Sequence, residues 1–235
     1  MEEKDNLICY KNGLRDGVPI MLGYFAVALS VGIVARNTGL NVLQATISSA
    51  MLNASAGQFA AYTLISTWAG FAECVVMMFV VNSRYLLMSC ALSQKFKADE
   101  PLINRLVVAY FITDEFFGLS VVQKPYLNPY YTFGLITVAS PAWTLGTTVG
   151  VVMGNVLPAS VVSALGVSLF GMFLAIIIPP ARKDKVIRLL VVVSMAASFA
   201  LARVSCVSSG MRIIILTIVI AAVAAFLFPL KEETI

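Results

Sequence analysis

Histidine is absent from this sequence, and charged residues make up only 12% of its 235 positions. Ser-His and Cys-His nucleophiles and the HExxH zinc motif all need an imidazole, so the missing histidine excludes these classes of enzyme. The four cysteines are dispersed and form no CxxC pair, which indicates buried thiols rather than a metal site or a disulfide framework. We therefore predict that the protein is not an enzyme and carries neither a metal nor a cofactor.

Polar surface is equally scarce, because 60% of the residues are hydrophobic and the mean hydropathy is +0.91. A soluble domain is about half apolar and about a quarter charged. Too few polar side chains remain here to cover an exterior in contact with water, whereas lipid can solvate apolar surface. The composition thus predicts an all-α integral membrane protein.

Apolar segments recur along the chain, each close to the ~20 residues that a helix needs to cross hydrocarbon. They span residues 18–35, 42–67, 71–92, 106–122, 130–153, 156–180, 187–202 and 212–229. We predict a polytopic helical bundle of about six to eight membrane segments that forms a single transporter domain over residues 1–235. Residues 1–17 contain acids, unlike a signal peptide, so we expect them to be retained as a cytoplasmic N-terminus, with Asp16 capping the first helix.

The spacing of the segments indicates an internal repeat. The first and fourth, second and fifth, and third and sixth segments start about 85 to 88 residues apart. This spacing predicts two three-segment repeats, 18–92 and 106–180, followed by a pair of C-terminal helices over 187–229.

Two of the segments contain residues that break a helix. The second is interrupted at 53–58, and the fifth at 140–141 and again at 146–148. Unwound backbone inside a membrane must face protein or a cavity, so paired breaks in matching segments point to the substrate site of a transporter. The alternative is that these small residues only pack helix against helix.

The distribution of Lys and Arg bears on whether the broken segments cross the membrane. If all eight segments cross, nine basic residues lie inside and six outside; if the second and fifth dip in and return, the count becomes eleven against four. Cytoplasmic loops carry the excess of Lys and Arg, so the count favours re-entrant segments. Both arrangements place the two termini in the cytoplasm.

Three charged residues fall well inside apolar segments: Arg84 in the third, and Asp114 and Glu115 midway along the fourth. Ionisable groups at such positions are costly and usually functional. Neighbouring helical residues point about 100° apart, so we expect one acid to pair with Arg84 while the other faces elsewhere. The alternative is a buried ion pair that only ties the third segment to the fourth.

Three stretches of the sequence resemble the AzlC family of branched-chain amino acid transporters. They are ASAGQFA at 54–60, VNSRYLLMS at 81–89 and TDEFF at 113–117, and weaker similarity continues at 13–19, 141–147 and 171–180. The likeness covers about residues 10–200 in order. Many members read AGASQF and NLRH where this chain has ASAGQF and NSRY.

This resemblance implies a permease of the bacterial inner membrane that exports leucine, isoleucine, valine or analogues, together with a small hydrophobic subunit of the AzlD type. Two other functions stay open. One is the permease subunit of an ATP-driven transporter, although neither 95–105 nor 179–188 contains an EAA-type loop for an ATPase. The other is a channel-like facilitator for small polar solutes, because paired broken segments also build pores.

An amino-acid substrate needs donors for its carboxylate, and the half-helix after Asn53 offers free N–H groups and a positive dipole end. We expect the substrate to contact Ser55, Gly57, Gln58, Asn82 and Arg84, with its apolar end against Phe59, Phe116 or Trp143. Alternatively, Ser55 and Gln58 only satisfy broken backbone.

The two adjacent acids suggest how export is energised. A carboxyl group in an apolar bundle, beside a second carboxyl group, binds a proton more readily than one in water. We therefore expect proton-coupled antiport, with one of Asp114 and Glu115 as the proton carrier and the other as the partner of Arg84.

Overall fold

The computed structural model describes residues 2–123, 125–154, 160, 174, 177–178, 181–203 and 209–228. The described residues form helices and no strand, which confirms the all-α prediction. In order along the chain, the helices are α1 (Glu2–Asn37), α2 (Val42–Leu52), α3 (Ser55–Ser66), α4 (Phe71–Ser93), α5 (Leu102–Tyr110), α6 (Asp114–Val121), α7 (Pro129–Met153), α9 (Lys185–Leu201) and α10 (Ser209–Leu227). The predicted sixth segment, 156–180, lies almost entirely outside the described residues.

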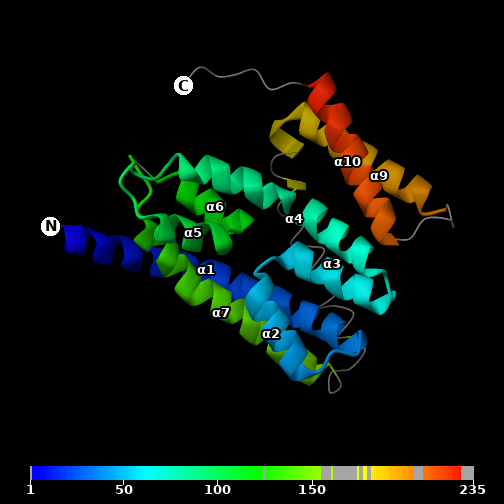
Figure 1. The fold of residues 1–235 in the computed structure, drawn as a ribbon, viewed down its shortest axis with the longest axis horizontal. Helices are drawn as coiled ribbons and strands as arrows, with labels where there is room; N and C mark the ends of the chain where they lie inside the picture. The colour runs from blue at the N-terminus through cyan, green and yellow to red at the C-terminus, as the bar shows by residue number, and fades with distance from the viewer. Residues whose placement is uncertain are drawn as a thin grey trace.

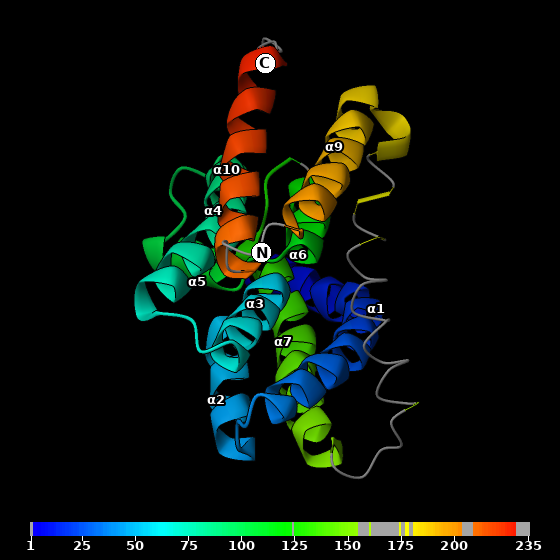
Figure 2. The same ribbon diagram turned by 90° about the vertical axis from the view of Figure 1, so that its right-hand side faces the viewer.

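Helices α1 and α7 make the most extensive contact among the described helices and lie side by side in both ribbon views (Figures 1 and 2). They run in the same direction, because Gly13 meets Tyr131 and Gly134 while Gly32 meets Thr147 and Gly150. At both places the glycine leaves no room for a Cβ atom, so the two backbones touch.

The prediction that α1 begins at residue 18 was wrong, since the helix already starts at Glu2. Asp16 is not its N-cap; the Asp16 carboxylate accepts a hydrogen bond from the Tyr131 hydroxyl at 3.1 Å. Pro19 lies inside the helix. Packing against α7 extends the helix through residues 13–17, where local sequence signals favoured a start.

The predicted break in the fifth segment was also wrong, because α7 is one continuous helix of 25 residues that contains Pro141. Its small residues serve the contact with α1: a Cβ atom at Gly146 would lie 2.6 Å from the Phe25 carbonyl oxygen. The alternative interpretation, helix packing, therefore holds for this segment. The prediction that this segment is re-entrant depended on a break in the helix, and the structure shows no such break in α7.

The predicted break in the second segment is confirmed. Helix α2 ends at Leu52, the next residue Asn53 has a left-handed φ of 38°, and α3 begins at Ser55. The Ser48 and Tyr62 hydroxyls are hydrogen-bonded at 2.7 Å, although 14 residues of straight helix would span about 21 Å. The chain therefore folds back on itself, and α2 and α3 form a helical hairpin, the shape that a re-entrant segment requires.

A second hairpin occurs in the fourth segment, where we expected an unbroken helix. Helix α5 ends at Tyr110, and α6 begins at Asp114 after Thr113, whose hydroxyl accepts a hydrogen bond from the Phe116 N–H. Beyond α6 the Leu127 N–H donates to the Lys95 carbonyl at 2.8 Å, so the chain returns to the end of α4. Asp114 and Glu115 thus lie in the first turn of a short helix, not midway along a spanning one.

The described helices contain the same pattern twice: a hairpin followed by a long helix. Helices α2, α3 and α4 begin at 42, 55 and 71, and α5, α6 and α7 begin at 102, 114 and 129, which is 58 to 60 residues later. Helices α4 and α7 run in opposite directions, so the second unit is inverted relative to the first (Figure 1). The broken segments that correspond are the second and fourth. The predicted repeat 106–180 lies partly outside the described residues and stays a prediction.

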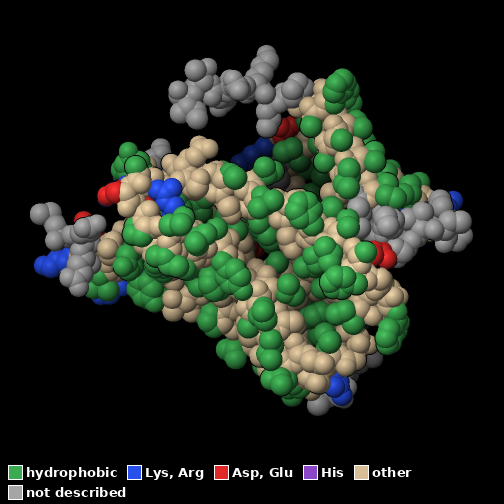
Figure 3. Space-filling model, viewed as in Figure 1, with side chains coloured by type: hydrophobic (Ala, Val, Ile, Leu, Met, Phe, Trp, Pro, Cys, Tyr) green, Lys and Arg blue, Asp and Glu red, His purple; other side chains and the backbone are tan. Residues whose placement is uncertain are grey.

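Helices α9 and α10 match the predicted C-terminal pair and contact the rest of the described structure mainly through α4 (Figure 1). Hydrophobic side chains are spread over the whole face in Figure 3, while charged ones are few. Among the described helices, those spanning Lys4–Asn37, Phe71–Ser93 and Pro129–Met153 are long and apolar enough to cross a membrane. Lipid can solvate their exposed side chains, such as Phe79 and Leu87.

The contact between α1 and α7 predicts a large difference between two glycines of α1. In Gly32→Ala the new Cβ atom meets the Thr147 carbonyl and lies 2.8 Å from Gly150 Cα. We therefore expect the free energy of unfolding to fall by about 1–3 kcal/mol, which should be measured as a lower melting temperature in detergent. Gly23→Ala is the matched control, because nothing lies within 4 Å of its new Cβ atom. Equal melting temperatures for the two variants would contradict the packing described.

Candidate functional site

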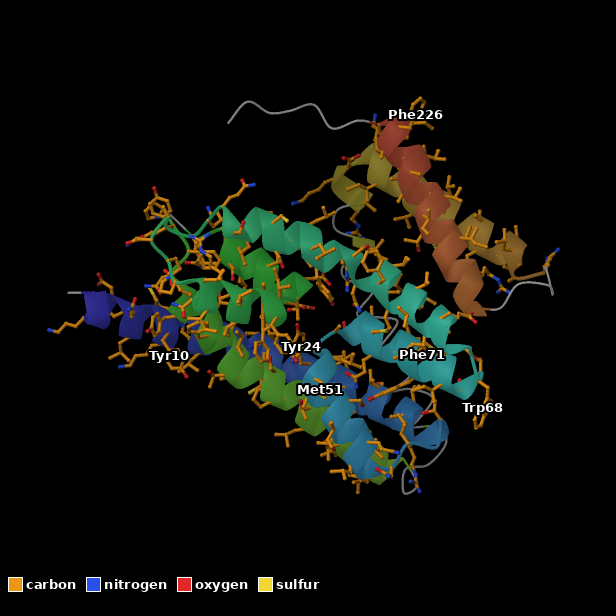
Figure 4. All side chains as sticks on the ribbon, in the orientation of Figure 1. Tyr10, Tyr24, Met51, Trp68, Phe71 and Phe226 are labelled. Carbon is orange, nitrogen blue, oxygen red and sulfur yellow. The ribbon has the colours of Figure 1, made fainter. Side chains whose placement is uncertain are left out.

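The two hairpins meet tip to tip in the middle of the molecule. The Tyr110 hydroxyl at the end of α5 donates a hydrogen bond to the Met51 carbonyl of α2 at 2.8 Å. Figure 4 labels Met51 of α2 and Tyr24 of α1, both in the middle of the view. A cavity with room for about one water molecule lies here. It is lined by Tyr24, Asn53, Ser55, Thr113, Ser140 and Trp143.

Beside the cavity, Arg84 of α4 and Asp114 of α6 form the expected ion pair, with Nη1 2.9 Å from Oδ2. The guanidinium also donates to the Tyr85 hydroxyl at 3.3 Å and lies 5.1 Å from the centre of the Tyr85 ring. Its buried Nε has no hydrogen-bond partner among the described residues. Arg84 therefore keeps one donor that Asp114 does not use.

Glu115 is held separately, by Tyr24 of α1. The Tyr24 hydroxyl lies 2.7 Å from Glu115 Oε2 and 2.7 Å from the Thr113 hydroxyl. A phenol has a single proton, so it can donate to only one of these two oxygens at a time. The Tyr24 ring packs against the rings of Trp143 at 5.4 Å and Phe116 at 6.1 Å. The two adjacent acids thus have different partners on different helices.

Gln58 lies behind the cavity wall. Its side chain is completely buried, its Oε1 accepts a hydrogen bond from Trp143 Nε1 at 2.7 Å, and its Nε2 donates to the hydroxyls of Tyr62 at 3.0 Å and Thr147 at 3.4 Å. The Ser49 hydroxyl donates to the same Thr147 oxygen at 2.9 Å. Gln58 is therefore saturated with protein partners and, in this state, does not face the cavity.

The remaining predicted residues divide between the cavity and its support. Ser55 lines the cavity at the start of α3, and this helix has no side-chain cap. Gly57 and Asn82 pack together, because a Cβ atom at Gly57 would lie 2.8 Å from Asn82 Oδ1. Asn82 thus fills the space beside Gly57, where we expected the substrate to make contact. Phe116 is buried in the protein core, whereas Trp143 reaches the cavity.

Sequence reasoning missed several residues of the cavity. Thr113 carries a usable signal, since a threonine followed by two acids is typical of a helix start. Ser140 belongs to the stretch where the sequence predicted a break in the fifth segment, but in the structure it lies on the unbroken helix α7. Tyr24 carries no local signal, because one tyrosine in an apolar helix is ordinary.

Comparisons with known proteins identify the family. The sequence profile described as "AzlC protein" matches residues 19–157. The chain belongs to the AzlC family. A membrane protein of Archaeoglobus fulgidus, described as uncharacterized, is 32% identical over 172 residues, which is 72% of this chain and 75% of that protein.

Other AzlC-related sequences are more distant. A membrane protein of Helicobacter pylori, also described as uncharacterized, is 27% identical over 64% of this chain and 67% of that protein. "Inner membrane protein YgaZ" of Escherichia coli is 23% identical over 75% of each chain. No solved structure matches this chain. These relatives indicate a membrane protein.

The ion pair of this AzlC-family chain predicts a specific coupling between two positions. In detergent, Arg84→Gln and Asp114→Asn should each lower the melting temperature, because each leaves the other charge without its partner. The double variant should be destabilised less than the sum of the two, by a coupling of about 0.5–3 kcal/mol. Arg105→Gln combined with Asp114→Asn is the control, since Arg105 bonds to the carbonyls of Lys97 and Glu100 instead. Strict additivity for the Arg84 pair would show that the ion pair is not formed in solution.

Proposed function

We propose that this protein is a secondary transporter that exports valine, leucine, isoleucine or close analogues across the bacterial inner membrane. The observation that carries the proposal is the meeting of two helical hairpins at a small cavity between α1 and α7, with three charged side chains beside it. Unwound backbone beside a central cavity is typical of transporter substrate sites.

The proposed site offers a place for each part of an amino acid. The uncapped start of α3 at Ser55 offers backbone N–H groups and a positive dipole end to the carboxylate. Arg84 adds its free Nε as a further donor. Gly57 and Asn82 hold the turn that presents these N–H groups. Binding leucine requires the hairpin tips to move apart, since the cavity holds only about one water molecule.

The ammonium group of the substrate pairs with Glu115 in this proposal. Asp114 is occupied by Arg84, so Glu115 is the acid left to carry a proton. A protonated carboxyl group has no charge with which to hold an ammonium group, so proton and substrate compete for Glu115. Competition for one group couples proton entry to amino-acid exit.

The chain works in this proposal with a small hydrophobic membrane subunit of the AzlD type, and both of its termini lie in the cytoplasm. Helix α10 favours the presence of a partner subunit, because it contains almost only apolar residues and many of its side chains are exposed, among them Ile218, Val219 and Val223. Another apolar helix can pack on such a surface as readily as lipid can.

The direct test is amino-acid export from cells loaded with dipeptides of valine, leucine or isoleucine. Cells that express this chain with a small subunit should release the free amino acids faster than cells without it, and this chain alone should give little release. Unchanged release of all three would contradict the substrate class. Full release by this chain alone would contradict only the need for a partner, and release that requires ATP in sealed vesicles would favour an ATP-driven transporter.

Glu115→Gln tests whether proton and substrate share this group. The glutamine keeps an acceptor for the Tyr24 hydroxyl but carries no charge and cannot bind a proton, so we expect loss of proton-driven efflux against a gradient and weaker exchange of labelled for unlabelled leucine. Asp99→Asn, in the exposed stretch before α5, is the control and should leave both processes intact. Efflux by Glu115→Gln that still collapses when an uncoupler is added would rule out Glu115 as the carrier.

A further inference from the structure

Trp143 is the largest side chain that lines the cavity. The other residues that line it are polar or carry a hydroxyl group: Tyr24, Asn53, Ser55, Thr113 and Ser140. A branched aliphatic side chain that enters this cavity can therefore lie against the indole ring of Trp143. Any change in the position of the Trp143 ring changes the space left for that side chain.

The Trp143 ring is fixed on two sides. Its Nε1 donates to Gln58 Oε1 at 2.7 Å, and the Tyr24 ring packs edge-on against it at 5.4 Å. Gln58 cannot move freely, because Tyr62 and Thr147 accept hydrogen bonds from its amide nitrogen. This makes the wall rigid, and a rigid wall can discriminate by size.

The hydrogen bonds around Gln58 fix its orientation. Hydroxyls of α2 bond to its two acceptors, Ser48 to Tyr62 at 2.7 Å and Ser49 to Thr147 at 2.9 Å. Such a buried and fully satisfied network is costly to rearrange. Trp143 is the member of this network that lines the cavity.

We propose that Trp143 sets the size of the amino-acid side chain that this protein accepts, and that Gln58 is the positioning residue that holds the ring. The proposal rests on the proposed function, since it concerns the apolar end of the same site. The substrate class that follows is aliphatic amino acids, with aromatic side chains excluded by contact with the indole ring.

The test is competition for exchange in vesicles that contain the complete transporter. Trp143→Phe removes part of the wall, so the preference for methionine or phenylalanine over valine should rise about tenfold, the effect of roughly one methylene group. Ser140→Val adds bulk one turn before Trp143 on α7, so the preference should shift the opposite way, toward valine.

Gln58→Leu tests the positioning role. With Trp143 present, Gln58→Leu should raise the preference for methionine or phenylalanine over valine, because the indole N–H loses its acceptor and the ring moves. In the Trp143→Phe background it should change the ratio no further, since phenylalanine has no N–H to hold. Ser120→Ala is the matched control: it removes a buried hydrogen bond, to the Thr132 hydroxyl at 3.2 Å, that lies outside the network around Gln58, and should leave selectivity unchanged.

The outcomes separate the two proposals. If the wild-type protein exchanges no branched-chain amino acid, the proposed function fails. If it does exchange them, unchanged ratios in folded Trp143→Phe and Ser140→Val overturn the role of Trp143. Equal effects of Gln58→Leu in both backgrounds overturn its role as a positioning residue. If Trp143→Phe does not fold, Gln58→Leu with Trp143 present decides, because an unchanged ratio there overturns the role of the ring.

Discussion

The arrangement depends on one constraint: backbone that leaves a helix inside an apolar bundle must find its hydrogen bonds within the protein. Helices break at Asn53 and again at Phe111–Thr113, and the two breaks meet between α1 and α7. Contacts such as Tyr110 to the Met51 carbonyl link them. The close packing of α1 and α7 supplies the rigid surface on which both hairpins rest. A polar cavity at the centre is therefore a consequence of how the breaks are accommodated.

The two inverted units have become chemically different at matching positions. Arg84 and Trp143 lie 59 residues apart, as do Ser55 and Asp114, and each long helix contacts the hairpin of the other unit. One of these contacts is ionic, and the other joins an indole to an amide. The site thus has a charged end and an apolar end, as an amino acid does.

The sequence predicted the helical membrane fold, the break at Asn53 and the Arg84 pair, because composition, helix-breaking residues and isolated charges are local signals. Sequence-based prediction failed where tertiary contacts decide whether a helix breaks or continues. Pro141 and Gly146 look like breaks, but packing against α1 keeps α7 whole. Conversely, Thr113 starts a helix within a segment that reads as continuous. The contact of Tyr24 with Glu115 joins residues 91 apart, so no local pattern could reveal it.

The central claim is that the substrate binds at the meeting of the hairpins, and tryptophan fluorescence tests it most directly. The chain has two tryptophans, of which Trp68 is 94% exposed and Trp143 is 3% exposed. In Trp68→Phe the emission comes from Trp143 alone. The account predicts a saturable change in that emission when leucine is added and none when lysine is added. Saturable binding of labelled leucine with no change in Trp143 emission would contradict it.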